Sequence, residues 1–347
     1  MSKVLVTGAA GFIGMHLIEL LTKKGFDVVG LDVINDYYDV DLKKNRLQHL
    51  GVEKAAIEYG VKIPGKKGFS FIQLLLEDKE NILKLFKAEE FDYIVNLAAQ
   101  AGVRYSLDHP QTYVDTNVTG FLSLLEAARA YPVKHFLFAS SSSVYGMNKK
   151  IPFKESDPTE HPLSLYAATK KSNEMLAHSY ADLFNIPLTG LRFFSVYGTW
   201  GRPDVALFIF TKAIIEGKPI DVYNNGNMDR DFTYVSDIVE GVSRLFDVLP
   251  EPVENKPGLP ADISRASYSV YNIGRGAPVS LMEFIREIEN NLGKKAEMNY
   301  MPMQLGDIEI SYADTSKLEN ATGYQPKTNV KEGVKAFVDW YKDYFKV

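Results

Sequence analysis

Apolar and polar positions follow two alternating patterns along the first half of the chain. Short apolar runs with the length of buried β-strands are separated by longer amphipathic segments with the spacing of helices. The predicted strands are Val4–Thr7, Val28–Asp32, Phe69–Leu74, Tyr93–Ala98 and Phe136–Ser140. Strands that alternate with helices form right-handed crossovers and a parallel sheet covered on both faces. The pattern therefore predicts an α/β protein with a doubly wound parallel sheet.

Beyond about residue 185 the alternation loosens, and Pro and Gly interrupt shorter elements, most densely over 250–260. The run Ile186–Phe194 still has the pattern of a buried strand, while Gly333–Phe345 has that of an amphipathic helix that packs back onto the body of the protein. The boundaries that we expect are a first domain over 1–185, returning segments at 230–250 and 270–275, and a smaller, interleaved C-terminal lobe formed mainly by 186–347.

The composition excludes several classes of protein. Every apolar run is well short of the ~20 residues that a membrane helix needs. Cys is absent, so disulfides, Cys-ligated metals and thiol nucleophiles are excluded, and redox chemistry requires a cofactor. The formal charge of -5 argues against a nucleic-acid partner. A glycine-rich stretch begins at Gly8, which leaves no room for a signal peptide. We therefore expect a soluble, cytoplasmic protein without a metal site.

That stretch, Gly8-Ala9-Ala10-Gly11-Phe12-Ile13-Gly14, lies between the first predicted strand and the helical segment Met15–Lys23. Glycine lets a backbone turn tightly and approach a pyrophosphate, whose charge is stabilised by the free N–H groups of the helix N-terminus. A glycine triplet elsewhere would merely join two elements. In this context it predicts the dinucleotide-binding turn of a Rossmann-type sheet.

Asp32 ends the second predicted strand, eighteen positions after Gly14. A carboxylate at that place can accept hydrogen bonds from the hydroxyls of the adenosine ribose. The following residues, Val33-Ile34-Asn35-Asp36, contain no Lys or Arg that would bind a 2′-phosphate. We therefore expect the cofactor NAD, although Asp32 taken alone could equally be a helix cap.

Tyr166 and Lys170 are four positions apart and face the same side of a helix. A nearby ammonium and a cationic nicotinamide ring would favour the phenolate and lower the pKa of Tyr166 from ~10 towards neutrality, as a general base requires. The hydroxyl cluster Ser140-Ser141-Ser142-Ser143 follows the apolar run Phe136–Ala139, at the end of a strand where ligands bind. Each feature alone could be incidental, but together with an NAD turn they predict an active site.

These motifs, in this order, resemble the extended short-chain dehydrogenase/reductase family over essentially the whole chain, and more specifically the UDP-glucuronate 4-epimerases. The segments on which the second resemblance rests are Asp36-Tyr37-Tyr38-Asp39, Leu42-Lys43-Lys44, Ala98–Ser106, Leu191–Gly198, Arg230–Val235 and Met303-Gln304-Leu305-Gly306-Asp307. The resemblance implies an isomerase that inverts C4 of UDP-glucuronate through a transient 4-keto sugar, with permanently bound NAD, and a homodimer.

The resemblance also implies roles for individual residues. Ser141, Tyr166 and Lys170 would be catalytic: Tyr166 is the base, Ser141 shares the sugar O4 proton, and Lys170 tunes Tyr166 and holds the nicotinamide ribose. The implied cofactor-binding residues are Gly8, Gly11, Phe12, Ile13, Gly14, Asp32, Asn35, Asp36, Leu76, Leu97, Ala98, Ala99, Asn117, Tyr166 and Lys170. The residues implied to bind the uridine diphosphate are Ser195, Tyr223, Arg230 and Asp307. The candidates for the C6 carboxylate are Arg104, Ser142, Ser143, Ser195 and Arg202.

The chain departs from similar proteins at Leu75-Leu76, where they usually have Asp-Leu and the Asp contacts adenine. Glu77 or Asp78 could substitute for that Asp, or backbone contacts could suffice. For Arg104 and Arg202 the alternative is a surface Arg beside an acidic neighbour.

Other activities remain open on the sequence alone. Similar decarboxylases have Glu at the position of Ser143, and 4,6-dehydratases have Asp-Glu at Ser142-Ser143, so this chain lacks their acid. A 4-epimerase of UDP-glucose or UDP-N-acetylglucosamine needs the same base and no carboxylate site. A non-catalytic NAD-sensing protein is the alternative from another class, and the intact Tyr166–Lys170 pair counts against it.

Overall fold

The computed structural model describes residues 1–304 and 307–347, so Leu305 and Gly306 of the quoted Met303–Asp307 segment lie outside the described residues. The strands are β1 (Lys3–Thr7), β2 (Asp27–Asp32), β3 (Lys62–Pro64), β4 (Phe69–Gln73), β5 (Tyr93–Asn96), β6 (His135–Ser141), β7 (Leu188–Phe193), β8 (Ser195–Tyr197), β9 (Ile220–Val222), β10 (Asp229–Arg230), β11 (Phe232–Tyr234), β12 (Tyr268–Ile273), β13 (Val279–Ser280), β14 (Met298–Tyr300) and β15 (Ile310–Ser311). The α-helices are α1 (Phe12–Lys23), α2 (Val40–His49), α3 (Lys79–Glu89), α4 (Tyr105–Asp108), α5 (Pro110–Tyr113), α6 (Phe121–Ala130), α7 (Leu165–Phe184), α8 (Ala206–Glu216), α9 (Val235–Arg244), α10 (Leu281–Leu292), α11 (Ser316–Thr322) and α12 (Val330–Phe345).

The main sheet has the strand order β12-β7-β6-β5-β1-β2-β4-β3. Its neighbouring strands are parallel, except that the edge strand β3 runs antiparallel to β4. The predicted doubly wound parallel sheet is therefore confirmed. The order of strands reverses between β1 and β5, and in such sheets ligands bind in the crevice at the carboxyl ends on either side of that point.

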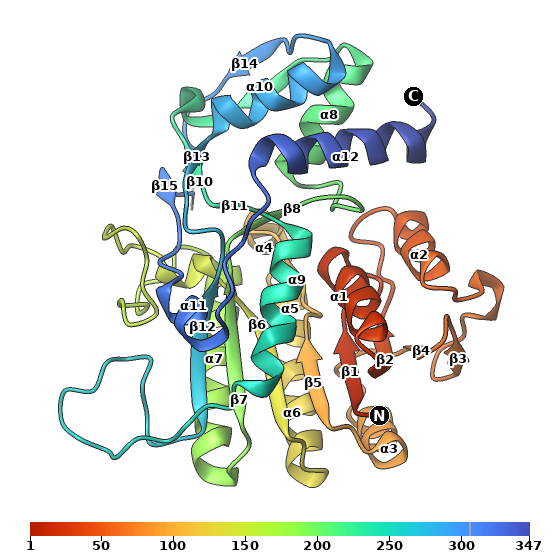
Figure 1. Ribbon diagram of the computed structural model, residues 1–347, viewed down its shortest axis with the longest axis vertical. Coiled ribbons are helices and arrows are strands. Elements are labelled where there is room, and N and C mark those ends of the chain that lie inside the picture. The colour runs from red at the N-terminus through yellow and green to blue at the C-terminus, as the bar shows by residue number, and fades with distance from the viewer. Residues whose placement is uncertain (305–306) are drawn as a thin grey trace.

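Helices cover both faces of the main sheet (Figure 1). Side chains alternate along β1, so Val4 and Val6 pack with α1 and α9 on one face, while Leu5 packs with α3, α6 and α7 on the other. Both faces are therefore apolar, which is why these strands appear in the sequence as continuous apolar runs rather than alternating ones.

The chain passes between the two parts of the molecule more than once. After leaving the sheet at β7 and forming α8, it returns as α9, which packs on α1, and β12 pairs in parallel with β7 from Tyr268↔Leu188 to Ile273↔Phe193. Helix α9 lies within the predicted segment 230–250, and β12 overlaps the predicted segment 270–275 but begins two residues before it. The interleaved arrangement therefore joins segments that are distant in sequence.

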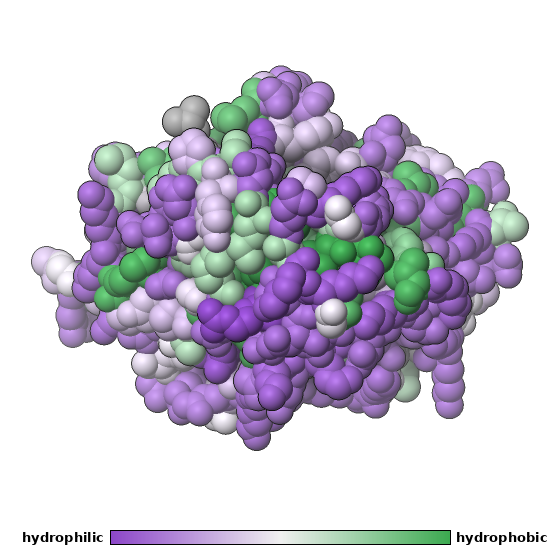
Figure 2. Space-filling model, turned by 90° about the horizontal axis from the view of Figure 1, so that it is seen from above, coloured by the Kyte–Doolittle hydropathy of each residue, from purple (hydrophilic) through white to green (hydrophobic). Residues whose placement is uncertain are grey.

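The smaller lobe lies above the carboxyl ends of the main sheet in Figure 1. It contains α8, α10 and α12 with three small sheets, β13-β10-β15, β11-β8 and β14-β9. Helix α12 packs within this lobe, where Phe337 and Tyr341 contact Phe208 of α8. Seen from above, the lobe is mostly hydrophilic, with apolar residues gathered across the middle of the view (Figure 2). Among the described residues, no helix combines the length and apolar character needed to cross a membrane.

His135 at the start of β6 is buried between the sheet and the returning segment. Its Nε2 lies 2.8 Å from Thr189 Oγ1 and its Nδ1 lies 3.3 Å from the Phe246 carbonyl oxygen. Burial lowers its pKa from 6.5 to about 4, despite opposing contributions from Phe246 and Asp247. Between these two values the unfolded chain binds a proton that the folded protein does not, so stability decreases as the pH falls through this range.

When the pH is lowered from 7 to 4.5, we expect His135 to decrease the free energy of unfolding by about 2 to 3 kcal/mol, because one pKa unit corresponds to about 1.4 kcal/mol. Urea unfolding of the wild type and of His135→Gln at both pH values measures the difference. The variant is expected to lose less stability over this interval than the wild type. An equal loss in both proteins would contradict the assignment.

Candidate active site

A cavity of about 560 Å³ lies between the carboxyl ends of the main strands and the smaller lobe. Its wall includes residues that follow β1, β2, β4, β5 and β6, together with side chains of α7, β8 and α8. Of the predicted cofactor-binding residues, the lining set contains Gly8, Gly11, Phe12, Ile13, Gly14, Asp32, Asn35, Leu76, Leu97, Ala98, Ala99, Tyr166 and Lys170. The fold therefore brings together cofactor-binding residues spread over nearly half of the chain.

The glycine turn between β1 and α1 is closed by a hydrogen bond from Gly11 N–H to the Gly8 carbonyl, 2.9 Å long. A Cβ atom on Gly14 would lie 2.0 Å from that carbonyl oxygen, and one on Gly8 would lie 2.9 Å from Ala98 N. Gly8 also has φ +73°, which disfavours other residues. The turn thus requires glycine at these places and leaves the N-terminus of α1 facing the cavity, where an anionic pyrophosphate fits.

Asp32 at the end of β2 accepts hydrogen bonds from Ala10 N–H at 3.0 Å and Ile34 N–H at 2.8 Å. Ile34 has φ +55°, an unusual backbone conformation for a β-branched residue. Burial raises the pKa of the Asp32 carboxyl, and the charge of Lys43 opposes that shift. Each carboxylate oxygen can accept more than one hydrogen bond, so Asp32 can still bind ribose hydroxyls.

Lys43 on α2 also lines the cavity, although sequence reasoning assigned it no role. Its Nζ donates a 2.6 Å hydrogen bond to the Asn35 carbonyl and lies 4.3 Å from the centre of the Tyr38 ring. Burial lowers its pKa. The residues 33–36, directly after Asp32, contain no Lys or Arg. The structure nevertheless places a cation at this end of the cavity, because Lys43, eleven positions after Asp32, reaches it from α2.

Asn117 does not line the cavity itself, but it holds Gln100, which does. It is 2% exposed, accepts a hydrogen bond from Gln100 N–H at 2.8 Å, and donates to Gln100 O and Thr169 Oγ1 at 3.0 Å. Tyr113 donates to the carbonyls of Ala101 and Gly102 at 2.9 and 2.5 Å. The two side chains together fix the loop after β5.

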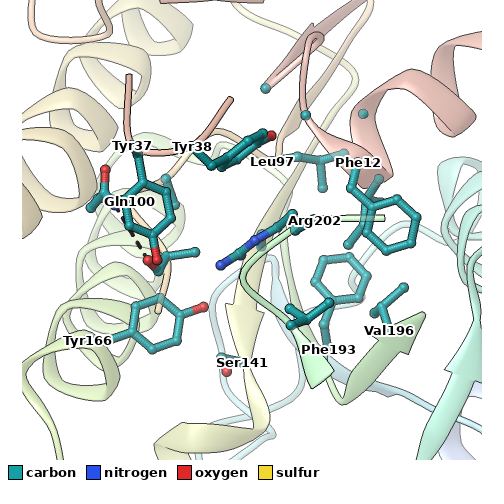
Figure 3. Close-up of a pocket in the computed structure, with 18 of the residues that line it drawn as sticks. Phe12, Tyr37, Tyr38, Leu97, Gln100, Ser141, Tyr166, Phe193, Val196 and Arg202 are labelled. Carbon is teal, nitrogen blue, oxygen red and sulfur yellow. Dashed lines mark hydrogen bonds between the residues drawn. The ribbon is translucent and has the colours of Figure 1, made fainter. Parts of the chain in front are cut away.

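Tyr166 and Lys170 lie on the first turns of α7, and Ser141 ends β6. Figure 3 shows Tyr166 and Ser141 at the same end of the cavity. Ser164 caps the helix by accepting a 3.1 Å hydrogen bond from Ala167 N–H. All three predicted catalytic residues line the cavity. The helix register and the strand end therefore place a phenol, an ammonium and a hydroxyl around one space.

The expected lowering of the Tyr166 pKa combined the Lys170 ammonium with a cationic nicotinamide ring, and it stays a prediction. Burial raises the pKa of Tyr166, while the Ser141 hydroxyl and the Arg202 charge act to lower it. Lys170 Nζ instead donates to the Ala139 carbonyl at 2.9 Å, and burial lowers its pKa to about 8. Within the described part of the chain, no hydrogen bond joins the two side chains, because the ammonium is directed to the end of β6 rather than to the phenol.

A buried ion pair holds α7 against the sheet. Arg192 of β7 donates from Nε and from its second terminal nitrogen to the two carboxylate oxygens of Glu174, at 2.8 and 2.9 Å. Ser140 donates to the same carboxylate at 2.7 Å. One hydroxyl of the Ser cluster is thus used to position the helix that bears Tyr166, a role that sequence reasoning missed.

The predicted substrate-binding residues fall into two groups. Those that line the cavity are Arg104, Ser195, Arg202, Tyr223, Arg230 and Asp307. Arg230 forms a 2.7 Å ion pair with Asp307. The Arg104 guanidinium lies 4.9 Å from the centre of the Tyr223 ring, and this contact joins the main sheet's side of the cavity to the smaller lobe. Ser142 and Ser143 are outside the lining set, as is Asp36 among the cofactor candidates.

Ser143 lies in a short 3-10 turn after β6. Its hydroxyl donates to Ser141 Oγ at 2.9 Å, and its N–H contacts the same oxygen at 3.2 Å. It therefore orients the Ser141 hydroxyl in this structure. Ser142 and Ser143 as carboxylate ligands stay a prediction.

Arg202 extends towards the middle of the cavity, between Tyr38 and Tyr166 (Figure 3). It forms an ion pair with Asp204, whose carboxylate also accepts a 2.9 Å hydrogen bond from the Tyr37 hydroxyl. The acidic neighbour raises the pKa of Arg202 despite its burial. Arg202 is therefore paired with an acidic neighbour, as the alternative interpretation of the sequence expected, but the pair lies in the cavity and not on the surface.

Arg46, fully buried on α2, connects the glycine turn to the loop that bears Arg202. It donates to the Ala10 carbonyl at 3.0 Å, to the Trp200 carbonyl at 2.7 and 3.1 Å, and to the Gly201 carbonyl at 3.2 Å. The position of Arg202 therefore depends on the nucleotide-binding turn.

The glycine turn, the carboxylate after β2 and the Tyr166–Lys170 pair around one cavity define a dinucleotide-dependent enzyme of the extended short-chain dehydrogenase/reductase class. The profile of the family described as GDP-mannose 4,6 dehydratase matches residues 5–337, and the chain belongs to this family.

Three relatives refine this placement. Protein CapI of Staphylococcus aureus is 51% identical and the alignment covers 99% of both chains. A probable UDP-glucuronate 4-epimerase of Rhizobium meliloti is 46% identical over 99% of this chain and 98% of its own. The crystal structure of Bacillus cereus UDP-glucuronic acid 4-epimerase in complex with UDP-glucuronic acid and NAD has a TM-score of 0.85 at 32% identity, covering 99% of each chain.

Proposed function

We propose that this protein is an NAD-dependent 4-epimerase that interconverts UDP-glucuronate and UDP-galacturonate through a transient 4-keto sugar. The observation on which this rests is the convergence of Tyr166, Lys170 and Ser141 on a cavity that also contains the glycine turn. Relatives named as UDP-glucuronate 4-epimerases, similar over the full length of this chain, support the substrate. The family is described by the name of a 4,6-dehydratase. We do not propose dehydration for this protein, because Ser142 and Ser143 stand where the dehydratases have their acids.

The residues of the cavity fit NAD. The glycine turn and the N-terminus of α1 would hold the pyrophosphate, Asp32 and Lys43 the adenosine ribose, and Lys170 the nicotinamide ribose. A Cβ at Gly14 would close the turn against Gly8, so the space for phosphate depends on the glycines. Held by these residues, NAD would supply reversible hydride transfer at C4 of the sugar.

The protein's own groups supply the proton transfer and the binding. Tyr166 removes the O4 proton and later returns it, and the Ser141 hydroxyl shares that proton. Arg230, with Asp307 beside it, and Tyr223 hold the uridine diphosphate, so that the pyranose can turn about its pyrophosphate link while it stays bound.

The C6 carboxylate needs hydroxyl donors and a cation. Arg104, Ser195 and Arg202 line the cavity and can provide them, and Ser142 and Ser143 directly follow Ser141, which also lines it. A 4-keto uronate is a β-keto acid that can lose carbon dioxide. A firmly held carboxylate and the absence of an acid at Ser142 and Ser143 both favour epimerisation over decarboxylation.

A homodimer in the cytoplasm is part of the proposal. Apolar side chains are exposed on neighbouring helices: Leu122 of α6 is 37% exposed, and Met175 and Leu183 of α7 are 63% and 68% exposed. An exposed apolar face of this kind suits a two-fold contact between identical subunits. The absence of Cys suits a reducing compartment.

Purified protein incubated with UDP-glucuronate and no added nicotinamide is expected to form UDP-galacturonate and no UDP-xylose. UDP-glucose should be epimerised roughly 100-fold more slowly, since charge-assisted contacts to the carboxylate are lost. Separation of the nucleotide sugars measures both rates. Arg104→Met should lower the rate of epimerisation of UDP-glucuronate more than that of UDP-glucose. Equal rates on the two sugars would contradict the carboxylate argument.

A further inference from the structure

Asp204 holds one edge of the Arg202 guanidinium. Nε of Arg202 donates to Asp204 Oδ1 at 2.9 Å, and Nη2 donates to Oδ2. A guanidinium has five N–H groups in a rigid plane, and this ion pair uses two of them. Nη1 donates to no residue within 1–304 and 307–347. The opposite edge of the guanidinium, formed by Nη1 and the second N–H of Nη2, is therefore available to a ligand.

The guanidinium points into the part of the cavity that contains the candidate base. Figure 3 shows its nitrogen atoms directed towards Tyr37 and Tyr166. Arg202 lines the cavity, whereas Asp204 is outside the lining set. Two parallel N–H groups on one edge match the two oxygens of a carboxylate. A sugar carboxylate can therefore bind Arg202 without displacing Asp204.

The Tyr37 hydroxyl holds Asp204 in turn. It donates a 2.9 Å hydrogen bond to Oδ2, the oxygen that also accepts from Arg202. The Tyr37 ring packs against Tyr105 with 4.7 Å between the ring centres, and a Cβ atom on Gly102 would lie 2.6 Å from the Tyr37 hydroxyl oxygen. The loop after β5 thus leaves a closely fitting place for Tyr37. Both oxygens of Asp204 have donors, which fixes the plane of the carboxylate.

We infer that Asp204, fixed by Tyr37, is a positioning residue that directs the free edge of Arg202 to the C6 carboxylate of the sugar and so sets the preference for a uronate. This inference rests on the proposed function, because it takes a UDP-uronate as the substrate. Without Asp204 the long side chain of Arg202 would occupy several rotamers, and a contact that depends on orientation would weaken. A neutral sugar makes no such contact.

Asp204→Asn tests this inference. The amide would present an N–H group to an N–H of Arg202, which breaks the paired contact. The value of kcat/KM for UDP-glucuronate is expected to fall about 10-fold, mostly through KM, because the carboxylate is bound in both the ground state and the transition state. The rate with UDP-glucose should change by less than about twofold. General damage to the fold would instead lower both rates together.

Tyr37→Phe removes one donor from Asp204 and leaves the ion pair in place. It should lower the preference for UDP-glucuronate over UDP-glucose by roughly 3-fold, in the same direction as Asp204→Asn. In a protein that already has Arg202→Met, the further change Asp204→Asn should leave the preference as it is, because Asp204 acts through Arg202.

Asp182→Asn is the matched control. The Asp182 carboxylate accepts from the same two nitrogens of an arginine, Nε and Nη2 of Arg265, both at 2.8 Å, and it lies outside the lining set. This variant should keep the wild-type preference. Steady-state kinetics with both nucleotide sugars measure all the variants.

The inference is overturned if Asp204→Asn keeps the wild-type preference. It is also overturned if that preference rises, since Asp204 would then compete with the sugar for Arg202, or if Asp204→Asn lowers the preference further in the Arg202→Met protein. A wild type that epimerises neither sugar, or both equally well, would instead overturn the proposed function.

Discussion

Replacement of Tyr166 by Phe is expected to lower the rate of epimerisation by about 10³-fold while the protein keeps its bound nicotinamide. Positioned proton transfer contributes roughly 10²- to 10⁴-fold to a rate. The change removes only the phenol oxygen that faces Ser141 in the cavity, and the ring that packs edge-on against Tyr113 at 6.2 Å remains. Steady-state rates with UDP-glucuronate, together with nicotinamide content after extraction, measure the two effects separately.

Tyr180→Phe is the matched control for this change. Tyr180 lies on the same helix and loses one hydrogen bond, to Glu126 at 2.7 Å, but it does not line the cavity. Its rate should stay within about twofold of the wild type, as expected for a surface substitution away from the site. A Tyr166→Phe variant that turns over as fast as Tyr180→Phe would exclude Tyr166 as the base.

Gly14→Ala is expected to give a protein without bound nicotinamide and without activity. The added Cβ would lie 2.0 Å from the Gly8 carbonyl oxygen and 3.3 Å from Ala9 Cα. These are backbone atoms that cannot rotate away, so the turn must open and move the N–H groups that would hold the pyrophosphate. We expect at least ~100-fold weaker NAD binding, measured by titration of the purified protein with NAD.

Gly241→Ala on α9 is the control, because its Cβ would meet neighbouring side chains at 3.7 Å, an ordinary contact. It should bind NAD as the wild type does, and alanine can even stabilise a helix relative to glycine. Circular dichroism checks that the Gly14 variant is folded. A folded Gly14→Ala protein with unchanged NAD affinity would show that the turn does not hold the cofactor.

Local patterns predicted the scaffold well. The predicted strand Val28–Asp32 is β2 with one residue added, and the glycine turn and Tyr166–Lys170 lie where their sequence context placed them. These features depend on residues a few positions apart. Periodicity, turn chemistry and helix spacing are therefore sufficient to locate them.

Contacts between segments that are distant in the sequence could not be predicted from local patterns. Lys43 reaches Asn35 only because α2 folds back over the end of β2, and Arg46 bridges two loops more than 150 positions apart. The hydrogen bond from Lys170 to the Ala139 carbonyl and the burial of Tyr166, which raises the pKa of its phenol, could not be predicted from the spacing of the two residues on a helix.

The repeated crossing of the chain between the main sheet and the smaller lobe restricts how the enzyme can open. Since β12 and α9 belong to the sheet layers while the segments before and after them build the lobe, the two parts have no single hinge about which to swing apart. Entry and exit of the sugar nucleotide must then depend on small movements of loops at the rim, such as the one that contains Arg202. Such a design favours a coenzyme installed once, during folding, and retained through many rounds of catalysis.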